Sequence, residues 1–396
     1  MRSLILPSFL LVWLLFSGNA LGQTQNVDAE KTSVRFATFN ISFNRKTEGL
    51  LKKKLATGKG LNFCRIAEII QRVNPDVILL NEFDYDEAGQ GVADFESKFL
   101  AVGQNGQQPI KFEYRYIAPS NTGVDSGVDL NGDGETGTPN DAFGYGVFPG
   151  QYAMVVLSKY PIESDKVRTF QKFLWKDMPE AAWPMVPETN LPFYSDEAVA
   201  VFRLSSKSHW DVPIDVDGKT IHLLASHPTP PAFDGDEDRN GKRNHDEIRL
   251  FADYISNQCD YLYDDNGKKG GLTEGSHFVI VGDQNADPND GDSFGDAANL
   301  MLNHPLVNSS FTPQSTGGAR YSKEQGGLND SQTGDPLQDT ADFGDHNVGN
   351  LRIDYCLPSK TLAITGSGVY WPAPDEEGAD LVKATDHRLV WIDIEK

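Results

Sequence analysis

The sequence predicts a single enzyme domain of the α/β or α+β class. Short apolar runs of strand type recur along the chain, and helical spacing of apolar residues appears between some of them. Long polar stretches separate these elements, but strands that belong together lie on both sides of each stretch. We therefore interpret the polar stretches as insertions in one domain rather than as linkers.

Composition supports this interpretation and excludes other classes. The chain has 396 residues, of which 39% are hydrophobic and 23% charged, so it can bury a large core and is not a disordered chain. Its net charge of -22 excludes a basic protein that coats nucleic acid. An acidic protein can still cut nucleic acid where metal ions and a local basic cleft handle the phosphates.

The strands are predicted from alternating or continuous apolar runs, and the two helices from apolar residues three or four apart. Asn74 and Pro75 end the first helix, and an acidic loop precedes the second. In chain order the expected elements are strand Val34–Ile41, helix 63–73, strands Asp76–Leu80, Ala153–Ser158 and Ile221–Ser226, helix 248–255, and strands Phe278–Gly282, Ile353–Leu357 and Leu389–Ile394.

Residues 1–22 are typical of a signal peptide. Arg2 precedes an apolar run from Leu4 to Phe16, and the small residues Ala20 and Gly22 resemble a cleavage site. The alternative is an uncleaved anchor, although the run is short for a bilayer. A polar tail at 23–33 then leads into one domain at 34–396. Its expected loop insertions are 119–150, 176–196, 232–247 and 284–349.

Three cysteines, Cys64, Cys259 and Cys356, are too few for a disulfide scaffold. The sequence leaves open whether two of them pair or all three are buried thiols. It contains no CxxC pair, which excludes a structural zinc site of that type.

Each polar residue with catalytic potential lies directly beside the end of a predicted apolar strand. A rigid strand holds such a side chain in a fixed place. Each residue alone could be an ordinary turn residue, but the whole set, with two histidines, favours a shared site. Its members are Asn40, Glu82, His227, Asp283, Asn285 and the pair Asp386 and His387.

The chemistry of this set suits phosphoryl transfer. Carboxylates and an amide oxygen favour a hard cation such as Mg²⁺, which often binds substrate phosphate as well. Two histidines and a further aspartate can donate hydrogen bonds and move protons around a phosphorus centre.

Five short motifs occur in an order that resembles the endonuclease/exonuclease/phosphatase superfamily, which includes deoxyribonucleases, inositol polyphosphate 5-phosphatases and secreted sphingomyelinases. The resemblance spans residues 34–394 and implies an α+β fold, a four-layered α/β/β/α sandwich of two mixed β-sheets with helices outside. The motifs are Thr38-Phe39-Asn40, Asn81-Glu82, Gly282-Asp283-Gln284-Asn285, Arg352-Ile353-Asp354-Tyr355 and Thr385-Asp386-His387.

The resemblance also implies roles in metal binding. Glu82 would be the principal ligand of a catalytic Mg²⁺ (or Mn²⁺), with Asn40 close by and Asp386 near the metal. Asp283 would orient or deprotonate the attacking water, and Asn285 would hold that water or a phosphate oxygen.

For the histidines, the resemblance implies phosphate contacts. His387 would contact the scissile phosphate, with its ring oriented by Asp354. His227 would donate a proton to the leaving group or contact a phosphate oxygen. The chain departs from the secreted deoxyribonucleases in offering only Gln151 and Tyr152 where they pair this histidine with a glutamate.

A calcium loop is a separate expectation. Asp236, Asp238, Asn240, Gly241 and Glu247 match the EF-hand pattern D-x-[DN]-x-[DN]-G-x5-E. We predict a structural Ca²⁺ bound there by the side chains of Asp236, Asp238, Asn240 and Glu247. The alternative is an acidic, solvated loop.

Two further segments have simpler interpretations. We interpret Lys207 and His209 as part of an exposed hairpin tip. Asn244 and Arg249 either lie near the phosphate or cap a helix.

The sequence thus predicts an exported Mg²⁺-dependent hydrolase of phosphate esters, secreted or periplasmic and monomeric. A phosphodiesterase or nuclease is the first interpretation, and a phosphomonoesterase acting on small organic phosphates is the second. Nucleic acid, a small organic phosphate and a phospholipid head group are the candidate substrates. A non-catalytic, calcium-binding surface module is the alternative from another class.

Overall fold

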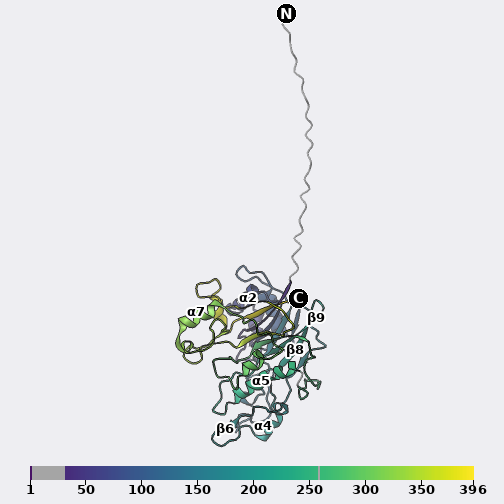
Figure 1. The fold of residues 1–396 in the computed structure, drawn as a ribbon, viewed down its shortest axis with the longest axis vertical. Coiled ribbons are helices and arrows are strands. Elements are labelled where there is room, and N and C mark those ends of the chain that lie inside the picture. The colour runs from purple at the N-terminus through teal and green to yellow at the C-terminus, as the bar shows by residue number, and fades with distance from the viewer. Residues whose placement is uncertain (2–31, 257–258) are drawn as a thin grey trace. The chain divides into compact units, whose positions relative to one another are not determined.

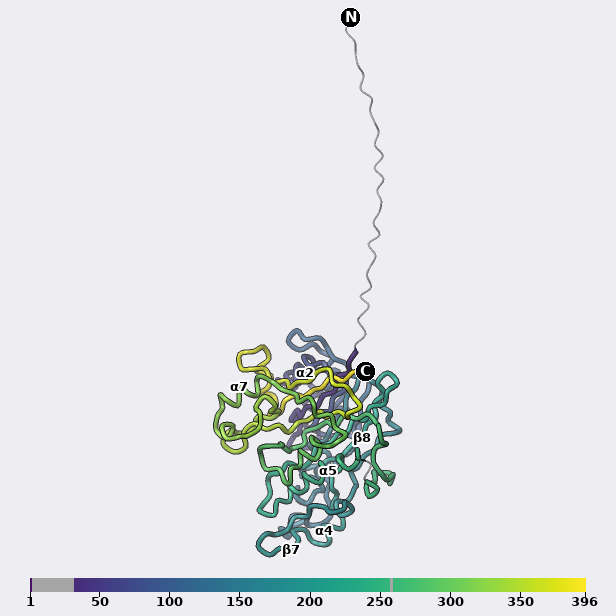
Figure 2. Tube along the Cα trace, viewed as in Figure 1, coloured from purple at the N-terminus to yellow at the C-terminus, as the bar shows by residue number. Residues whose placement is uncertain are grey.

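Two mixed β-sheets form the centre of the fold (Figures 1 and 2). The computed structural model describes residues 32–256 and 259–396 together with Met1. The first sheet contains β1 (Ser33–Asn40), β2 (Val77–Asn81), β3 (Tyr114–Tyr116), β4 (Met154–Ser158), β14 (Ile364–Val369) and β15 (Val390–Glu395). The second contains β5 (Arg168–Thr169), β8 (His209–Val216), β9 (Lys219–Ser226), β10 (His277–Asp283) and β13 (Asp354–Pro358).

The strand order is β14-β15-β1-β2-β4-β3 in the first sheet and β13-β10-β9-β8-β5 in the second. Each sheet has one parallel pair, β1 with β2 and β9 with β10, among antiparallel neighbours. The carboxyl ends of a parallel pair lie at the same edge of the sheet. This topology brings polar residues that follow those strands close together.

Both faces of each sheet are buried, which explains the continuous apolar runs in the sequence. Phe36 of β1 and Leu223 of β9 belong to one cluster that fills the space between the sheets. Their neighbours Ala37 and Leu224 face the other way, into two separate outer clusters. Three apolar layers therefore alternate with two sheets.

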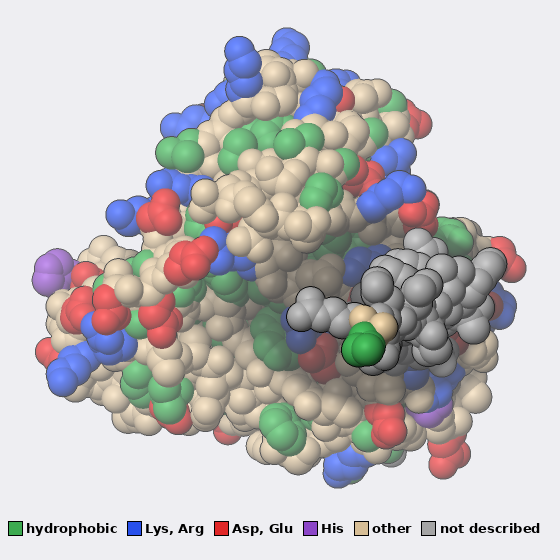
Figure 3. Space-filling view, turned by 90° about the horizontal axis from the view of Figure 1, so that it is seen from above, with side chains coloured by type: hydrophobic (Ala, Val, Ile, Leu, Met, Phe, Trp, Pro, Cys, Tyr) green, Lys and Arg blue, Asp and Glu red, His purple; other side chains and the backbone are tan. Residues whose placement is uncertain are grey.

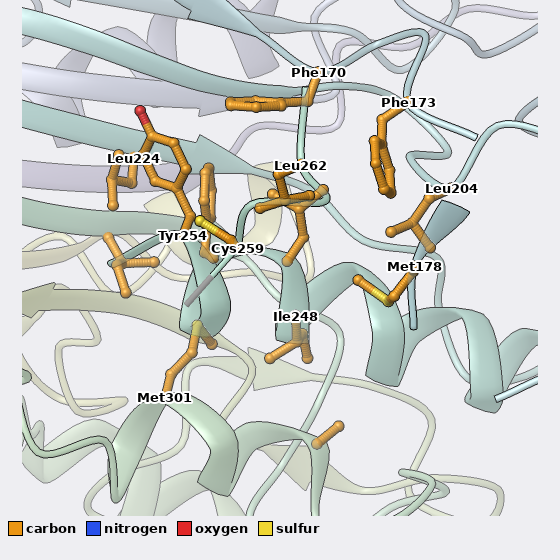
Figure 4. Close-up of a cluster of buried hydrophobic side chains, with 14 of the residues drawn as sticks. Phe170, Phe173, Met178, Leu204, Leu224, Ile248, Tyr254, Cys259, Leu262 and Met301 are labelled. Atoms are coloured by element: carbon orange, nitrogen blue, oxygen red, sulfur yellow. The ribbon is translucent and has the colours of Figure 1, made fainter. Parts of the chain in front are cut away.

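Helices cover both outer faces. On the first sheet these are α1 (Leu50–Ala56), α2 (Leu61–Val73), α3 (Gln90–Phe95) and a π-helical turn at Glu96–Leu100. On the second they are α4 (Asp196–Val201), α5 (Arg239–Ser256) and α6 (Ala297–Leu302). Figure 4 shows Ile248 and Tyr254 of α5 and Met301 of α6 in the same cluster as Leu224 of β9. The predicted four-layered α/β/β/α sandwich is confirmed.

The remaining elements are short and lie mainly in the polar insertions. They are β6 (Met185–Val186), β7 (Leu191–Pro192), β11 (Ala341–Asp342), β12 (Asn350–Leu351), α7 (Thr316–Gln325) and 3₁₀ turns at Pro139–Asp141, Trp175–Asp177, Gly327–Asp330 and Leu381–Ala384. The helix α7 was not predicted, because its ten residues include no aliphatic side chain larger than alanine.

The prediction of a loop over residues 232–247 is wrong for its second half, because α5 already begins at Arg239. The buried face of α5 continues toward its start through polar residues, which apolar periodicity does not detect. Each of these residues has a buried partner. Arg243 donates to the carbonyl oxygens of Leu204 and Phe143, and Asp246 accepts a 2.6 Å hydrogen bond from the Trp175 indole.

Residues Ser33–Lys396 form one compact unit. The predicted signal peptide at 1–22 lies outside the described residues, apart from Met1, and so does nearly all of the polar tail. Among the described residues, no helix combines the length and hydropathy that crossing a bilayer requires.

The three cysteines are free thiols. One face of the molecule carries basic side chains interspersed with acidic ones (Figure 3).

Candidate active site

The polar residues at the strand ends meet at one edge of the two sheets. Asn40 ends β1 beside Asn81, the last residue of β2, and Glu82 follows directly. Asp283 ends β10 and lies opposite Asp354, which begins the antiparallel strand β13. Because the two sheets pack face to face, residues from both contribute to the same place.

Asn40 links the two sheets. Its side-chain nitrogen donates to Glu82 Oε1 at 3.2 Å and to Asp283 Oδ2 at 3.0 Å. Its side-chain oxygen accepts the backbone N–H of Ser42. Asn40 is fully buried. In this arrangement its amide orients the two carboxylates, and its oxygen is already used within the chain.

Two histidines point at the same oxygen of Asp283. The Nε2 atoms of His227 and His387 lie 3.4 Å and 3.6 Å from Asp283 Oδ2. The other nitrogen of His387, Nδ1, is 3.0 Å from Asp354 Oδ2. The hydroxyl of Thr340 donates to that carboxylate oxygen as well, at 3.0 Å. Asp354 therefore fixes the direction of the His387 ring.

Burial and neighbouring charges shift the pKa values of the titratable groups of the site in different directions. Burial raises the pKa of Asp283 to about 6, although His387 opposes the shift. Burial alone would lower the pKa of His387, but Asp354 and Asp283 outweigh it and raise the value to about 10. Burial and the charge of Lys207 hold the pKa of His227 well below its ordinary value. At neutral pH the site therefore contains an ionised Asp283, a cationic His387 and a neutral His227.

The donor set fits a divalent cation. Asp283 and Asp354 each offer a carboxylate oxygen within 4.8 Å of the other and of His387, which is cationic and therefore donates rather than ligates. Burial also raises the pKa of Glu82, whose carboxylate lies in the same site. Asp386 is half-exposed at its rim, with Oδ1 4.0 Å from His387 Nε2. Carboxylates gathered in a buried place are stabilised by a hard cation, which selects oxygen ligands.

Asn285 forms the wall of the site beside His227. Its backbone is left-handed, with φ at 52°, and its N–H donates to Asp283 Oδ1 at 2.9 Å. Its side-chain nitrogen donates to the carbonyl of Pro228 at 3.1 Å. Gln284, which lies between Asp283 and Asn285 in the chain, points away from the site and donates to the Ser226 hydroxyl. Within the described chain, Nδ1 of His227 has no hydrogen-bond partner, in keeping with the absence of a paired glutamate.

The predicted calcium loop is wrong. Its last three quarters are helical, and Glu247 is fully buried inside α5, whereas Asp236 is exposed. The two oxygens of Glu247 accept the backbone N–H groups of Ser206 and Thr229, both at 2.6 Å. Asn240 donates its side-chain N–H to the carbonyl of Ala232. Asp236, Asp238, Asn240 and Glu247 therefore do not surround one cation site.

Glu247 instead braces the site, together with Asn244. Asn244 donates to the carbonyl oxygens of Thr229 and Gln284 at 2.8 Å and 2.9 Å. The start of α5 thus holds the segments that follow β9 and β10. Asn244 neither caps the helix nor has a free nitrogen for phosphate. Arg249 bonds Pro179 and Asp253 on the outer side.

Lys207 and His209 are not an exposed tip. Both are buried, with 7% and 1% of their surfaces exposed, and His209 begins β8. His209 bonds the Ser205 hydroxyl and the backbone oxygen of Glu247, which makes it structural. Alternating apolar residues from Trp210 to Val216 were the signal that could have identified this strand.

Comparison with known proteins agrees with the fold and the motifs. Residues 37–387 match the sequence model of the Endonuclease/Exonuclease/phosphatase family. An endonuclease/exonuclease/phosphatase from Beutenbergia cavernae has a similar structure, with a TM-score of 0.50 and 17% identity over 92% of this chain and 72% of that one. The sequence comparison with curated proteins found no match.

Two further solved structures align less closely. TDP2 from Caenorhabditis elegans gives a TM-score of 0.44 and 13% identity, over 92% of this chain and 74% of that one. A beta toxin from Staphylococcus aureus, with bound magnesium ions, gives a TM-score of 0.44 and 12% identity, over 92% of this chain and 100% of that one.

The family match includes every residue of the site from Asn40 to His387 and supports an enzyme rather than the non-catalytic module. The chain belongs to the endonuclease/exonuclease/phosphatase family and is a metal-dependent hydrolase of phosphoric esters.

Proposed function

We propose that this enzyme is an exported, Mg²⁺-dependent phosphodiesterase or nuclease. The observation that carries the proposal is the convergence on Asp283 Oδ2, where two histidine Nε2 atoms and the Asn40 amide all lie within 3.6 Å. A carboxylate surrounded by donors can accept a proton from water while the donors hold phosphate oxygens.

Each residue of the site has a distinct role in the proposed reaction. Asp283, ionised above about pH 6, orients and deprotonates the attacking water. His387 is cationic and donates from Nε2 to a phosphate oxygen, while Asp354 holds its ring. Asn285 positions a second phosphate oxygen, and His227 contacts the phosphate on the leaving-group side.

Glu82 is the principal ligand in this proposal, with Asp386 near the cation and Asn40 orienting Glu82. When bound, Mg²⁺ supplies Lewis-acid neutralisation of the phosphate charge. The donor set consists of carboxylates and amides, which favours Mg²⁺ or Mn²⁺ over softer metals.

The test is a substrate panel with added Mg²⁺ that includes plasmid DNA, RNA, sphingomyelin, inositol phosphates and a nitrophenyl phosphodiester. We expect hydrolysis of a diester, with kcat at least about 100-fold lower for Glu82→Ala, because the principal metal ligand is lost. Glu163→Ala is the control and should keep full activity, because Glu163 contacts Thr220 near the start of β9, at the opposite end of that strand from the site. Unchanged activity of Glu82→Ala, or full activity in chelator alone, would contradict the assignment.

Export rests on the signal-like composition of residues 1–22. We expect the secreted or periplasmic protein to begin near residue 23, as N-terminal sequencing can show. A protein retained in the cytoplasm with residues 1–22 intact would refute export. We also propose that the enzyme is a monomer, which size-exclusion chromatography with light scattering tests.

A further inference from the structure

Arg388 is a buried arginine that directly follows His387 in the chain. Only 2% of its surface is exposed. Its Nη1 atom donates to three backbone oxygens, those of His387 at 2.9 Å, Thr385 at 3.0 Å and Val382 at 3.4 Å. All three oxygens belong to the segment that carries His387 into the site. One side chain therefore holds this segment from the interior of the molecule.

The other nitrogen of the guanidinium group contacts the long polar insertion. Nη2 of Arg388 donates to Asp342 Oδ2 at 2.9 Å, and its Cζ atom lies 4.2 Å from the centroid of the Trp371 ring. Asp342 ends β11, near the end of the insertion at 284–349. The ion pair thus connects the insertion to the segment that precedes β15.

Backbone contacts join the same two segments. The N–H group of Asp342 donates to the carbonyl oxygen of Asp386 at 2.8 Å. Ala341, the residue before it, forms an antiparallel β-bridge with His387. The strand β11 therefore lies directly against the two residues of the site that come from this segment.

These contacts suit a group that fixes a backbone segment in place. Burying a guanidinium group is unfavourable unless acceptors surround it, and Arg388 has four of them on two segments. Its planar array of donors reaches several acceptors at once, which a lysine cannot reproduce. A displacement of about 1 Å at a reacting group can lower a rate about 100-fold. The position of the His387 backbone is therefore important for the reaction.

We propose that the pair of Arg388 and Asp342 positions His387 for catalysis, so that the insertion supports the active site. Arg388 is a positioning residue, because it acts through the backbone of the segment that carries His387. The inference rests on the proposed function in one respect, namely that His387 contacts the reacting phosphate. It assigns a catalytic purpose to a polar insertion that composition alone marks as a loop.

The chain offers a matched control in Arg168. This arginine is also buried, with 5% of its surface exposed, and it pairs with Asp264 at 2.8 Å. It donates to the carbonyl oxygens of Lys268 and Gly270 as well. Arg168 lies in β5, at the opposite edge of the second sheet from β13, which borders the site. The two arginines have similar burial and partners, but the loop that Arg168 holds is remote from the site.

The first experiment measures kcat, KM and melting temperature for Lys and Met variants of both arginines. On the best diester of the panel, well below every melting transition, we expect kcat to fall about 100-fold in Arg388→Met, with KM within about threefold of the wild type. Arg388→Lys keeps the charge and should recover about tenfold of this loss. Both Arg168 variants should lose melting temperature but keep kcat within about twofold. Wild-type kcat in folded Arg388→Met, or an equal loss in Arg168→Met, would overturn the proposal.

Asp342→Asn tests the part played by the insertion, and it stays informative if Arg388→Met does not fold. We expect kcat to fall about tenfold, because the guanidinium loses its charged partner and shifts. Asp264→Asn, the same change beside Arg168, should leave kcat unchanged. In the Arg388→Lys background, the losses should not multiply, because the two residues act as one pair. Fully multiplicative losses, or no loss in Asp342→Asn, would refute the role of the insertion.

The second experiment does not require turnover. Nδ1 of His387 lies 3.0 Å from Asp354 Oδ2, so its N–H proton should give a downfield NMR signal, identified by its loss in His387→Ala. We expect this signal to shift or broaden in Arg388→Lys and to stay unchanged in Arg168→Lys. If the wild type hydrolyses no phosphate ester but shows this difference, the proposed function fails and the positioning of His387 stands. An unchanged signal in Arg388→Lys would count against the positioning of His387.

Discussion

Replacing Asp283 with asparagine should lower activity strongly and stabilise the metal-free protein. The carboxyl group is 1% exposed, and burial raises its pKa from the ordinary 3.8 to about 6. The folded protein thus binds this proton more tightly than the unfolded chain. The wild type therefore loses stability as the pH rises from about 4 to about 6, and the loss persists above that range.

The size of the effect follows from the shift. About two pKa units, at about 1.4 kcal/mol each, correspond to roughly 3 kcal/mol at pH 8. Part of this gain is lost in Asp283→Asn, because the new amide N–H groups meet the Asn40 nitrogen and the histidines, which donated to the carboxylate. We therefore expect the variant to be about 1–3 kcal/mol more stable at pH 8, with the difference shrinking toward zero below pH 4.

The assay is urea denaturation in chelator at pH 4, 6 and 8, followed by tryptophan fluorescence. Asp165→Asn, at an exposed loop position, is the control and should show no pH-dependent change. With Mg²⁺ at pH 8, kcat of Asp283→Asn should fall by a factor of about 10² to 10⁴, the range typical for loss of a general base. A variant no more stable than the wild type at pH 8, or equally shifted at pH 4 and pH 8, would refute the reasoning.

Three further predictions concern neighbouring features. Asp354→Asn should lower kcat about 10- to 100-fold without changing the Mg²⁺ requirement. Because Asp354 helps to raise the pKa of His387 to about 10, the alkaline limb of the pH–rate profile should move toward neutrality; a profile identical to that of the wild type would contradict this. Glu247→Gln should lower the unfolding free energy by about 1–3 kcal/mol, since one of two buried backbone N–H groups loses its acceptor, and an unchanged urea midpoint would count against the brace. The three cysteines are free thiols, so a reducing agent should leave the melting temperature unchanged, and a drop would reveal a disulfide.

The strand-end residues could be predicted from the sequence for a physical reason. A strand that is buried on both faces has a continuous apolar sequence. The polar residues that follow it therefore lie at the edge of the sheet. Asn40, Glu82 and Asp283 all follow such runs, and the structure places their side chains together. The pairing of Asp354 with His387 came from the resemblance, because no local pattern relates two residues 33 positions apart.

Buried polar residues account for the errors. Glu247, Asn244 and Arg243 extend the buried face of α5, but their partners are backbone atoms of distant segments. The same acidic and amide residues that suggested a calcium loop are what such a helix uses to hold loops in place. Lys207 was missed for a related reason, because a buried lysine looks identical in sequence to an exposed one.

The amide of Asn40 makes the reaction centre dependent on how the two sheets fit together. It holds Glu82 of one sheet and Asp283 of the other within hydrogen-bonding distance of one nitrogen atom. A sideways slip of one layer by an ångström would separate the metal ligand from the base even if every strand stayed intact. Substitutions at interior positions such as Leu79 or Val281, remote from any substrate, can therefore silence the enzyme while it remains folded. Turnover thus reports the alignment of the whole sandwich, and selection for activity is also selection on its interior.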